Sequence, residues 1–453
     1  MKILFCLLIV AMPLLGGCSG SGSSAAPPAD LAATAGDGRV KLTWTAAPEV
    51  NYWLFSATDP SLTAFVWTSL PNAQVYQNAV SPFYMCGLFD ATPYYFAANG
   101  RTGGGPGGSS SPTVTATPYK TGSTWSASAV PSTSNLYGVG YASLTTCSNN
   151  TTSATGSFAV VGASGVIATS TDGINWSNLA SPVTSDLYAV TGYAANQNNP
   201  SNPALRWVAV GDGGVSLYSV DGLNWVTGRG QAVLPDPPNP ALRSLTQVAG
   251  TFFAAGDAGT ILSSTDGITW TARTSGTTNN LKGITRGSIF VAVGDGGKIL
   301  TSIDGNIWTT RSSGTTNILR QVSSVGVIYV AVGDAGTVVT SIDGGATWTS
   351  LPTSTTTIAA SSNLVSVAAE SNFVINAVAD PLLGFISSAQ FVAVDSTGKA
   401  YTSTNGLTWS VPITTGISTL SNVGQPLVSS GFGYAAVGAS GVPAASGVMA
   451  TSF

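Results

Sequence analysis

Short apolar runs separated by glycine- and aspartate-containing turns recur through most of the chain. The clearest unit runs from Phe290 to Trp308 and reads FVAVGDGGKILTSIDGNIW. Its apolar runs at 290–293 and 298–301 have the length and β-branched content of buried strands. Between and after them lie the turns 294–297 and 302–305, where glycine allows positive φ and aspartate accepts backbone N–H groups. The pattern predicts a strand–turn–strand–turn unit in which each turn holds a structural aspartate.

The second turn belongs to the pattern S-x-D-G-x-x-W, which recurs along the chain. Its six copies begin at Ser170, Ser219, Ser264, Ser302, Ser341 and Ser403. The fifth copy is one residue longer, and the sixth has Asn405 in place of aspartate. A fourth apolar run, at 281–284, precedes the clearest unit, and the tryptophan that ends the motif opens a further strand. Four short strands in each unit of roughly forty residues are typical of a β-propeller blade.

The units allow the blades to be counted. Each starts at a leucine, near Leu136, Leu187, Leu242, Leu281, Leu319, Leu364 and Leu420. The last unit has no S-x-D-G motif and no tryptophan of its own. We expect residues 123–126, at the other end of the segment, to supply its outer strand and so close the ring without open edges. The sequence predicts seven blades, with six as the alternative.

The S-x-D-G-x-x-W motif resembles the Asp-box, or BNR, repeat of sialidases and related propellers. The longer form, G-D-x-G-x-[IV]-x-x-S-x-D-G-x-x-W, is similar to the blades of the photosystem II assembly/stability factor family. The resemblance covers most of residues 123–453. It implies a fold more than an activity, because the Asp-box is a structural turn in unrelated enzymes and binding proteins. It assigns structural turn roles to Asp172, Asp221, Asp266, Asp304 and Asp343.

The N-terminus reads as a targeting segment. Lys2 precedes an apolar stretch at 3–15 that is too short to span a bilayer stably. The following Leu-Gly-Gly-Cys18 resembles a bacterial lipobox, which implies cleavage after residue 17 and lipidation of the Cys18 thiol. The alternative is an ordinary secretory signal. Residues 18–28 are rich in Ser, Gly, Ala and Pro and predict a flexible tether, and Ser19 after the cysteine favours the outer membrane.

Residues 29–118 predict a separate β domain before the propeller at 119–453. Leu31, Ala33, Val40, Leu42 and Trp44 alternate with polar residues across a Gly-Asp-Gly turn. With Trp44 and the Thr92-x-Tyr94 pair, which matches a tyrosine corner, the segment resembles a fibronectin type III domain. The resemblance implies a β-sandwich that serves as a spacer. The whole chain is therefore expected to be all-β, a fibronectin type III sandwich followed by a seven-bladed propeller.

Composition excludes several kinds of chemistry. Charged residues are 8% of the chain and the net charge is −4, which gives no support to nucleic-acid binding. Without histidine, the chain lacks His-ligated zinc, a histidine general base and a Ser-His-Asp triad. Cys86 and Cys147 remain after the signal segment. An oxidising compartment allows them to pair, but they lie in different predicted domains, so a disulfide and free thiols both stay open.

The carboxylates limit the possible enzymes. Most aspartates belong to the repeats, either to the Asp-box or to the earlier Gly-Asp turns at Asp212, Asp257, Asp295 and Asp334. Outside these repeats and the first domain remain Asp186, Asp236, Asp380 and Glu370. A glycoside hydrolase of the Asp-box propeller type acting on polysaccharide would need two of these four to face each other across the channel. A sialidase would also show an arginine triad with a Tyr/Glu pair and an Arg-Ile-Pro-like start, and the sequence has no such start.

Basic residues recur at two positions of the repeat. Arg243, Lys282 and Arg320 follow the leading leucine in three consecutive units, and Arg273 and Arg311 end the last strand of two units. We expect these five to gather on one sector, near the Gly-Asp turns. The resemblance to the photosystem assembly family implies a basic patch that grips protein partners. The alternative is that the cations pair with the turn aspartates and solvate the ring.

Exposed aromatic side chains are a further candidate site. Tyr137, Tyr188 and Trp207 suit a sugar platform or, alternatively, packing between blades.

These patterns favour a surface-anchored, non-enzymatic binding or assembly protein of the bacterial envelope. We expect an envelope or extracellular protein or glycan partner, a lipid-anchored monomer, and neither a cofactor nor a metal. The Asp-box hydrolase is the alternative from another class, and a structural matrix component is a third.

Overall fold

The structure, a computed structural model, is all-β and divides into two compact units, of which the second consists mainly of residues 118–453. It describes residues 23–36, 39–86, 88, 92–118, 126–132, 134–143, 156–171, 175–195, 204–228, 239–352, 357–373 and 387–415, and the strands between 419 and 452.

The first unit holds two sheets. The larger is antiparallel and consists of β1 (Ser24–Ala25), β7 (Tyr94–Arg101), β4 (Asn51–Ala57) and β5 (Gln74–Ala79), with β8 (Val114–Ala116) paired to β7. The smaller consists of β2 (Ala32–Gly36), β3 (Arg39–Thr43) and β6 (Phe83–Cys86). Val40, Leu42 and Trp44 are buried, as their alternation predicts, and the Trp44 and Tyr52 rings meet edge to face at 5.9 Å.

The folded part of this unit begins within the segment predicted as a tether. Ser24 and Ala25 pair with Arg101 and Gly100, and the Ser23 N–H donates to Thr102 Oγ1 at 3.2 Å. The short strand forms because its backbone groups complete the edge of β7, a pairing that does not require apolar side chains. Composition alone therefore placed the start of the folded unit too late.

The second unit contains six four-stranded antiparallel sheets, each with its strands in chain order. They are β10 (Leu136–Ser143) to β13 (Ser177–Leu179), β14 (Leu187–Ala195) to β17 (Val226–Thr227), β18 (Leu242–Val248) to β21 (Thr271–Arg273), β22 (Leu281–Arg286) to β25 (Thr309–Arg311), β26 (Leu319–Val325) to β29 (Thr349–Ser350), and β30 (Leu364–Phe373) to β33 (Ile413–Thr414).

Their second strands are β11 (Gly156–Gly162), β15 (Ala204–Gly211), β19 (Thr251–Gly256), β23 (Phe290–Gly294), β27 (Ile328–Gly333) and β31 (Ser387–Asp395). Their third strands are β12 (Ile167–Ser170), β16 (Ser216–Ser219), β20 (Ile261–Ser264), β24 (Ile299–Ser302), β28 (Val338–Ser341) and β32 (Lys399–Ser403). We call each sheet a blade and name it by its first strand. Six of the seven predicted leucines begin such a strand.

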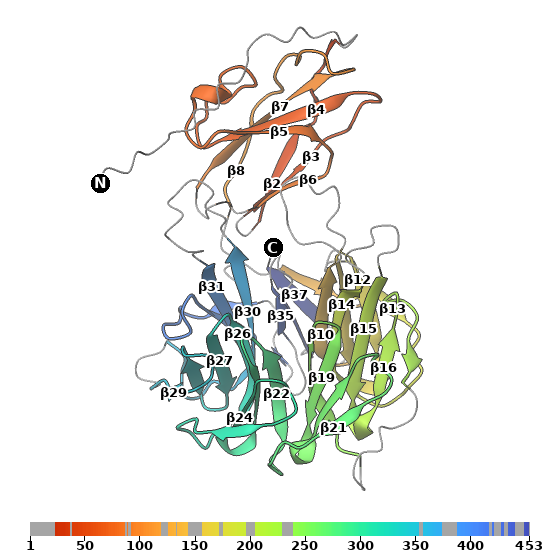
Figure 1. The fold of residues 1–453 in the computed structure, drawn as a ribbon, viewed down its shortest axis with the longest axis vertical. Coiled ribbons are helices and arrows are strands. Elements are labelled where there is room, and N and C mark those ends of the chain that lie inside the picture. Colours follow the sequence, from red (N-terminus) through yellow and green to blue (C-terminus); the bar gives the residue numbers. More distant parts are fainter. Residues whose placement is uncertain are drawn as a thin grey trace, which may run out of the picture. The chain divides into compact units, whose positions relative to one another are not determined.

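The seventh sheet closes the ring. It consists of β34 (Thr419–Leu420), β35 (Leu427–Ser429), β36 (Tyr434–Ala439), β37 (Val448–Ser452) and β9 (Ser126–Ala129). Met449 pairs with Ser128, so the two ends of the propeller segment share one sheet. The described outer strand is 126–129 and includes Ser126 of the predicted segment 123–126, whereas residues 119–125 lie outside the described part of the chain. Consecutive first strands contact one another around the ring, where β35 touches both β30 and β10 (Figure 1).

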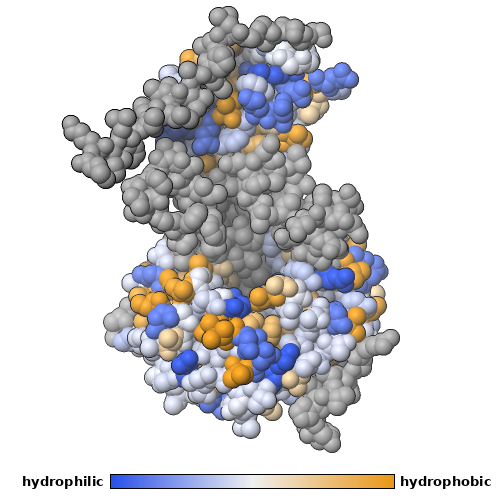
Figure 2. All heavy atoms as spheres, in the orientation of Figure 1, coloured by the Kyte–Doolittle hydropathy of each residue, from blue (hydrophilic) through white to orange (hydrophobic). Residues whose placement is uncertain are grey.

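The core lies between blades. One cluster joins Val291 and Ile299 of the β22 blade to Leu319, Tyr329 and Val339 of the β26 blade, all fully or nearly fully buried. Because alternate side chains of a strand point to opposite faces, a blade covered on both faces needs apolar residues at successive positions. This requirement explains the continuous apolar runs of the sequence. The exposed face of this unit in Figure 2 is mostly pale, the colour of Ser, Thr and Gly.

Candidate functional site

The first strand of each four-stranded blade carries a β-bulge one residue after its leading leucine. Leu242 pairs with Gly256 and Ser244 with Ala255, so Arg243 is left outside the ladder. The same register shift occurs in all six blades, because two residues on one strand face one position on the next. The bulge residues are Tyr137, Tyr188, Arg243, Lys282, Arg320 and Val365. They occupy equivalent places at the start of the inner strands, an end of the ring we call the mouth.

Four of these side chains form a continuous row across four consecutive blades, which we call the mouth cluster. The Tyr137 and Tyr188 rings lie 5.6 Å apart, and the Arg243 guanidinium lies over Tyr188 at 4.4 Å. Arg243 Nε and Nη2 donate to the two Asp257 oxygens at 3.1 and 2.6 Å. Lys282 Nζ, from the next blade, lies 3.5 Å from Asp257 Oδ1. One turn carboxylate therefore bridges cations of two blades.

Arg320 contacts the turn aspartate of its own blade, as Arg243 does. Its Nε contacts Asp334 Oδ1, and its Nη2 donates to Asp334 Oδ2 at 3.0 Å. The three mouth cations thus all contact aspartates of the Gly-Asp turns. These contacts match the alternative in which cations pair with turn aspartates, so the local positive charge is largely compensated. Asp295, in the turn between Asp257 and Asp334, accepts from Asn280 Nδ2 at 2.9 Å.

Electrostatics at the mouth follow from partial burial. Burial on its own would raise the pKa of Asp257, but the Arg243 hydrogen bond and charge, with Lys282, lower that pKa below its ordinary value. Burial would lower the pKa of Arg243, yet Asp257 raises it. Burial raises the pKa of Tyr188, and the Arg243 charge opposes this rise. Burial, followed by the charge of Asp186, raises the pKa of Tyr137. At neutral pH Arg243 and Asp257 are therefore charged, and the two tyrosines beside them are neutral.

The two other predicted basic residues lie elsewhere on their blades. Arg273 is on β21 and Arg311 on β25, each three strands outward from the mouth strand of its own blade, or roughly 14 Å at the usual strand spacing. Arg273 Nε donates to Ser263 Oγ at 2.9 Å, and Arg311 Nε to Thr301 Oγ1 at 3.0 Å. The five cations therefore form two separate groups, because the strand order of a blade separates its first and last strands.

The predicted Asp-box aspartates cap their own turns. Asp266 Oδ1 accepts the N–H groups of Ile268 and Thr269 at 2.8 and 2.7 Å, and the Ser264 hydroxyl at 2.9 Å. Asp221, Asp304 and Asp343 make equivalent bonds, and Asn405 replaces the carboxylate with an amide oxygen. Asp172 lies outside the described residues. The next residue, Gly267, lies against Val208 of the preceding blade, so the turn also fills the space between blades.

Of the four candidate hydrolase carboxylates, the structure gives the backbone positions of Asp186 and Glu370. Asp186 precedes the mouth end of β14 and accepts the Ser164 N–H at 2.9 Å. Glu370 lies six residues after Leu364, toward the opposite end of β30. At about 3.3 Å per residue, the two backbones differ by roughly 20 Å along the channel, whereas glycosidase carboxylates lie about 5–10 Å apart. Asp236 and Asp380 lie outside the described residues.

The three aromatic candidates lie in two different places, one in the core between blades and two at the mouth. Trp207 is 1% exposed and packs among Ala142, Leu187 and Leu217, so it serves packing. Tyr137 and Tyr188 lie at the mouth.

Cys86 ends β6 and Cys147 lies outside the described residues, so their pairing stays open. Within the described ranges no group of three His, Cys, Asp or Glu side chains could hold a metal, and no helix there is long and apolar enough to cross a membrane.

Two features of the site were not anticipated. A side chain before the leading leucine ties a blade to the turn of the preceding blade, as Asp186 does for Ser164 and Asn280 Oδ1 does for the Ala258 N–H at 2.9 Å. The recurring Asp or Asn at that place is a signal that the sequence offers. The sharing of Asp257 by two blades has no such signal.

The fold and this mouth define a β-propeller protein. A family model described as the DUF6242 beta propeller domain matches residues 207–312. A chain of the structure "Crystal Structure of Mitotic Checkpoint Complex" aligns with a TM-score of 0.50 at 10% identity, covering 74% of this chain and 93% of that chain.

Two YCF48 structures have TM-scores below 0.5. "YCF48 bound to D1 peptide" aligns with a TM-score of 0.49 at 14% identity, covering 72% of this chain and 94% of that chain. "YCF48 from Cyanidioschyzon merolae" aligns with a TM-score of 0.47 at 16% identity, covering 73% and 98%. No curated protein matches the chain. At such identities the likeness concerns the fold alone.

Proposed function

We propose that this chain is a non-enzymatic binding protein of the bacterial envelope, and that its mouth docks a protein partner. The observation that carries the proposal is the continuous row of Tyr137, Tyr188, Arg243 and Lys282 across four blades. Val365 occupies the same bulge position in another blade, so the blade itself requires neither an aromatic nor a basic residue there. Tyrosine and arginine are enriched in the energetically important centres of protein interfaces.

The charge arrangement favours a protein over a simple anion. Asp257 and Asp334 already engage the three cations, so an incoming anion would have to compete with fixed carboxylates. A protein surface can instead offer donors to the carboxylates and acceptors to the remaining guanidinium N–H groups. Such mutual complementarity chiefly contributes specificity and orientation. Because Arg243 is held by Tyr188 and Asp257 before binding, little side-chain freedom would be lost on docking.

We further propose that Cys18 is lipidated and that the first unit is a fibronectin type III-like spacer. Its two sheets and buried Trp44 support this assignment, although tethering through Cys18 rests on the lipobox resemblance. The folded unit begins near Ser24, because Ser23 already contacts Thr102. Six residue steps separate Cys18 from Ser24. Fully extended, they reach about 20 Å, so the spacer would lie close to the membrane. Labelling with radioactive palmitate, with Cys18→Ser as the control, tests the anchor.

The docking proposal is tested by photocrosslinking in cells that make the full chain. A photoreactive amino acid replaces Tyr137 at the mouth or, in a separate strain, Thr274 on an outer edge. We expect a specific envelope-protein adduct from the mouth probe only. The triple variant Arg243→Ala, Lys282→Ala, Arg320→Ala should remove that adduct, and Arg273→Ala with Arg311→Ala should leave it intact.

Each result of this experiment has a definite meaning. An adduct that survives the triple variant would move the docking surface away from the cations. An adduct from both probes would mean contact without a defined site. If neither probe gives a protein adduct, the mouth is not a protein-docking surface. A purified triple variant with unchanged circular dichroism shows that a lost adduct does not reflect unfolding.

A further inference from the structure

The outer strands carry a second recurring position that differs between blades. In each four-stranded blade, the turn between the second and third strands ends at a glycine, and the residue two places after it lies in the third strand. One residue at the outer strand lies opposite that position. Arg273 lies opposite Ile261 in this way, and Arg311 lies opposite Ile299. The six residues at this position are Leu179, Gly228, Arg273, Arg311, Leu351 and Ile413. Four blades thus fold with an apolar residue or glycine there. The two arginines are not required by blade structure, and they lie on adjacent blades.

These two guanidinium groups are held in place but are not neutralised. Each uses Nε to bond a hydroxyl of the neighbouring strand, Ser263 Oγ or Thr301 Oγ1. In the part of the chain that the structure describes, neither forms an ion pair, and their terminal nitrogens make no hydrogen bond. The mouth cations differ, because all three contact aspartates. An arginine fixed through Nε and free at its terminal nitrogens presents donors suited to a carboxylate.

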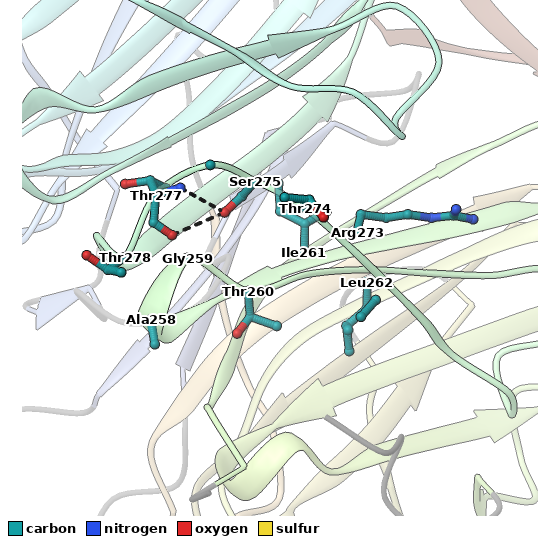
Figure 3. A pocket seen from close by; sticks show the side chains of 12 residues that line it. Ala258, Gly259, Thr260, Ile261, Leu262, Arg273, Thr274, Ser275, Thr277 and Thr278 are labelled. Atoms are coloured by element: carbon teal, nitrogen blue, oxygen red, sulfur yellow. Dashed lines mark hydrogen bonds between the residues drawn. The ribbon is translucent and has the colours of Figure 1, made fainter. Parts of the chain in front are cut away.

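An open groove lies beside each of these arginines. The first, of about 570 Å³, follows β21 and the turn 274–278 above the residues 258–262 (Figure 3). The Ser275 hydroxyl bonds the backbone N–H and carbonyl of Thr277 and fixes the turn, and the Arg273 side chain extends away from it at one end. The exposed Thr274 and Thr278 add hydroxyl groups. The groove is lined by hydroxyl groups and glycine, has no aromatic anchor, and has an apolar part formed by Ala258, Ile261, Leu262 and Ala272.

The adjacent blade has a second groove that shares the arginine and the hydroxyl-bearing turn of the first. Its groove, of about 610 Å³, is lined by Arg311, by the turn 312–316 and by Lys298. Thr274 forms an isolated parallel bridge with Ile307, which lies two residues before the first residue of β25. Arg311 lies four residues beyond Ile307, so the two arginine backbones are roughly 15 Å apart. The pair therefore suits a ligand that is extended, hydrophilic and anionic at intervals.

We propose that these two grooves bind an acidic polysaccharide, with uronate carboxylates on Arg273 and Arg311 and sugar hydroxyls along the threonine-lined turns. Carboxylate spacing along a polymer allows both grooves to engage one chain, which raises the overall affinity beyond that of one groove. This rim site is separate from the mouth cluster and uses none of its residues. A propeller that docks protein at the mouth could thereby also hold an envelope polysaccharide at its rim.

Affinity electrophoresis of the purified full chain in gels containing polygalacturonate, with neutral dextran gels as the reference, tests the proposal. The wild type should be retarded only by polygalacturonate. Arg273→Ala with Arg311→Ala should weaken retardation about tenfold or more, since charge-assisted hydrogen bonds are lost at both sites. Arg273→Lys with Arg311→Lys should keep part of it. The matched control, Arg243→Ala with Arg320→Ala, removes the same charge at the mouth and should change retardation less than about twofold.

Three results would overturn the proposal. They are a wild type that polygalacturonate does not retard, equal retardation of the Arg273/Arg311 variant, and equal loss in the mouth control. Polyglutamate, added as a competitor, decides the ligand class. If it displaces the protein as well as soluble polygalacturonate does, the rim recognises carboxylates on any backbone, and the assignment to a polysaccharide fails. Failure at the rim leaves the mouth proposal untouched, because the photocrosslinking result is decided by the Tyr137 probe and the mouth triple variant, and the rim residues serve there only as controls.

Discussion

The contact between Asp-box turns and the preceding blade makes a sharp prediction about glycine. Gly267 has φ of +74°, and a Cβ added there would lie 2.5 Å from Val208 Cγ2 of the preceding blade. Gly213, in a Gly-Asp turn, has φ of +61° with no atom within 4 Å of such a Cβ. The backbone is left-handed at both positions, but only at Gly267 would an added Cβ also clash with a neighbouring side chain. Alanine at these two sites therefore separates the backbone cost from the packing cost.

The magnitudes follow from this difference. A left-handed alanine costs about 1–2 kcal/mol, and the chain already accepts that cost at Ala258 and Ala335, which have φ of +55° in the turn equivalent to that of Gly213. The stiff Val208 side chain cannot rotate away cheaply, and overpacking adds about 1–3 kcal/mol. We expect Gly213→Ala to destabilise the propeller by about 1 kcal/mol and Gly267→Ala by about 2–5 kcal/mol.

Guanidinium chloride unfolding followed by tryptophan fluorescence measures both variants against the wild type. Gly305→Ala is a second crowded case, because its Cβ would lie 2.4 Å from Phe253 Cε1. It should resemble Gly267→Ala and differ from Gly213→Ala. Equal destabilisation of all three variants would refute the reasoning, since it would show that the turns do not act as packing elements between blades.

Other predictions concern the carboxylates. Asp221→Asn should lower the free energy of unfolding at neutral pH by less than about 1 kcal/mol, because Asn405 already caps an equivalent turn. Asp221→Ala should lower it by about 1–2 kcal/mol. A larger loss for asparagine than for alanine would contradict the capping role. Although burial opposes it, hydrogen bonds from Asn224 and Leu223 lower the pKa of Asp221 to about 2 from an ordinary 3.8. Its contribution to stability is therefore full above about pH 4 and lost as pH falls toward 2, and unfolding midpoints across that range should fall less steeply in Asp221→Asn than in the wild type. A double-mutant cycle of Arg243→Ala and Asp257→Asn should give a coupling free energy of about 1 kcal/mol, between exposed and buried pairs because the side chains are 19% and 25% exposed; a value near zero would mean that the pair does not stiffen the mouth.

Much of the architecture was predictable from the sequence because it depends on local chemistry repeated many times. The leading leucines mark the first strands, since each begins a run that must be buried on both faces of a blade. The Asp-box aspartates could be assigned to turns because they bond N–H groups two and three residues away, as Asp266 does. Closure was predictable from the missing outer strand. The extension of that strand to Ala129 was not, because the alternation of serine and alanine there gives no side chain that fixes the register.

The candidate sites depended on contacts that the sequence does not encode locally. A one-residue bulge frees Arg243 and Lys282 from the ladder, and only the ring brings Lys282 of one blade to Asp257 of another. The same ring geometry leaves Arg273 and Arg311 on outer strands without carboxylate partners among the described residues, although the sequence suggested one sector for all five cations. The sequence by itself thus determined the blades and their turns, since these arise from strand periodicity and short-range hydrogen bonds. The tertiary structure decided which charges meet and which stay free, because that depends on distances across strands and between blades.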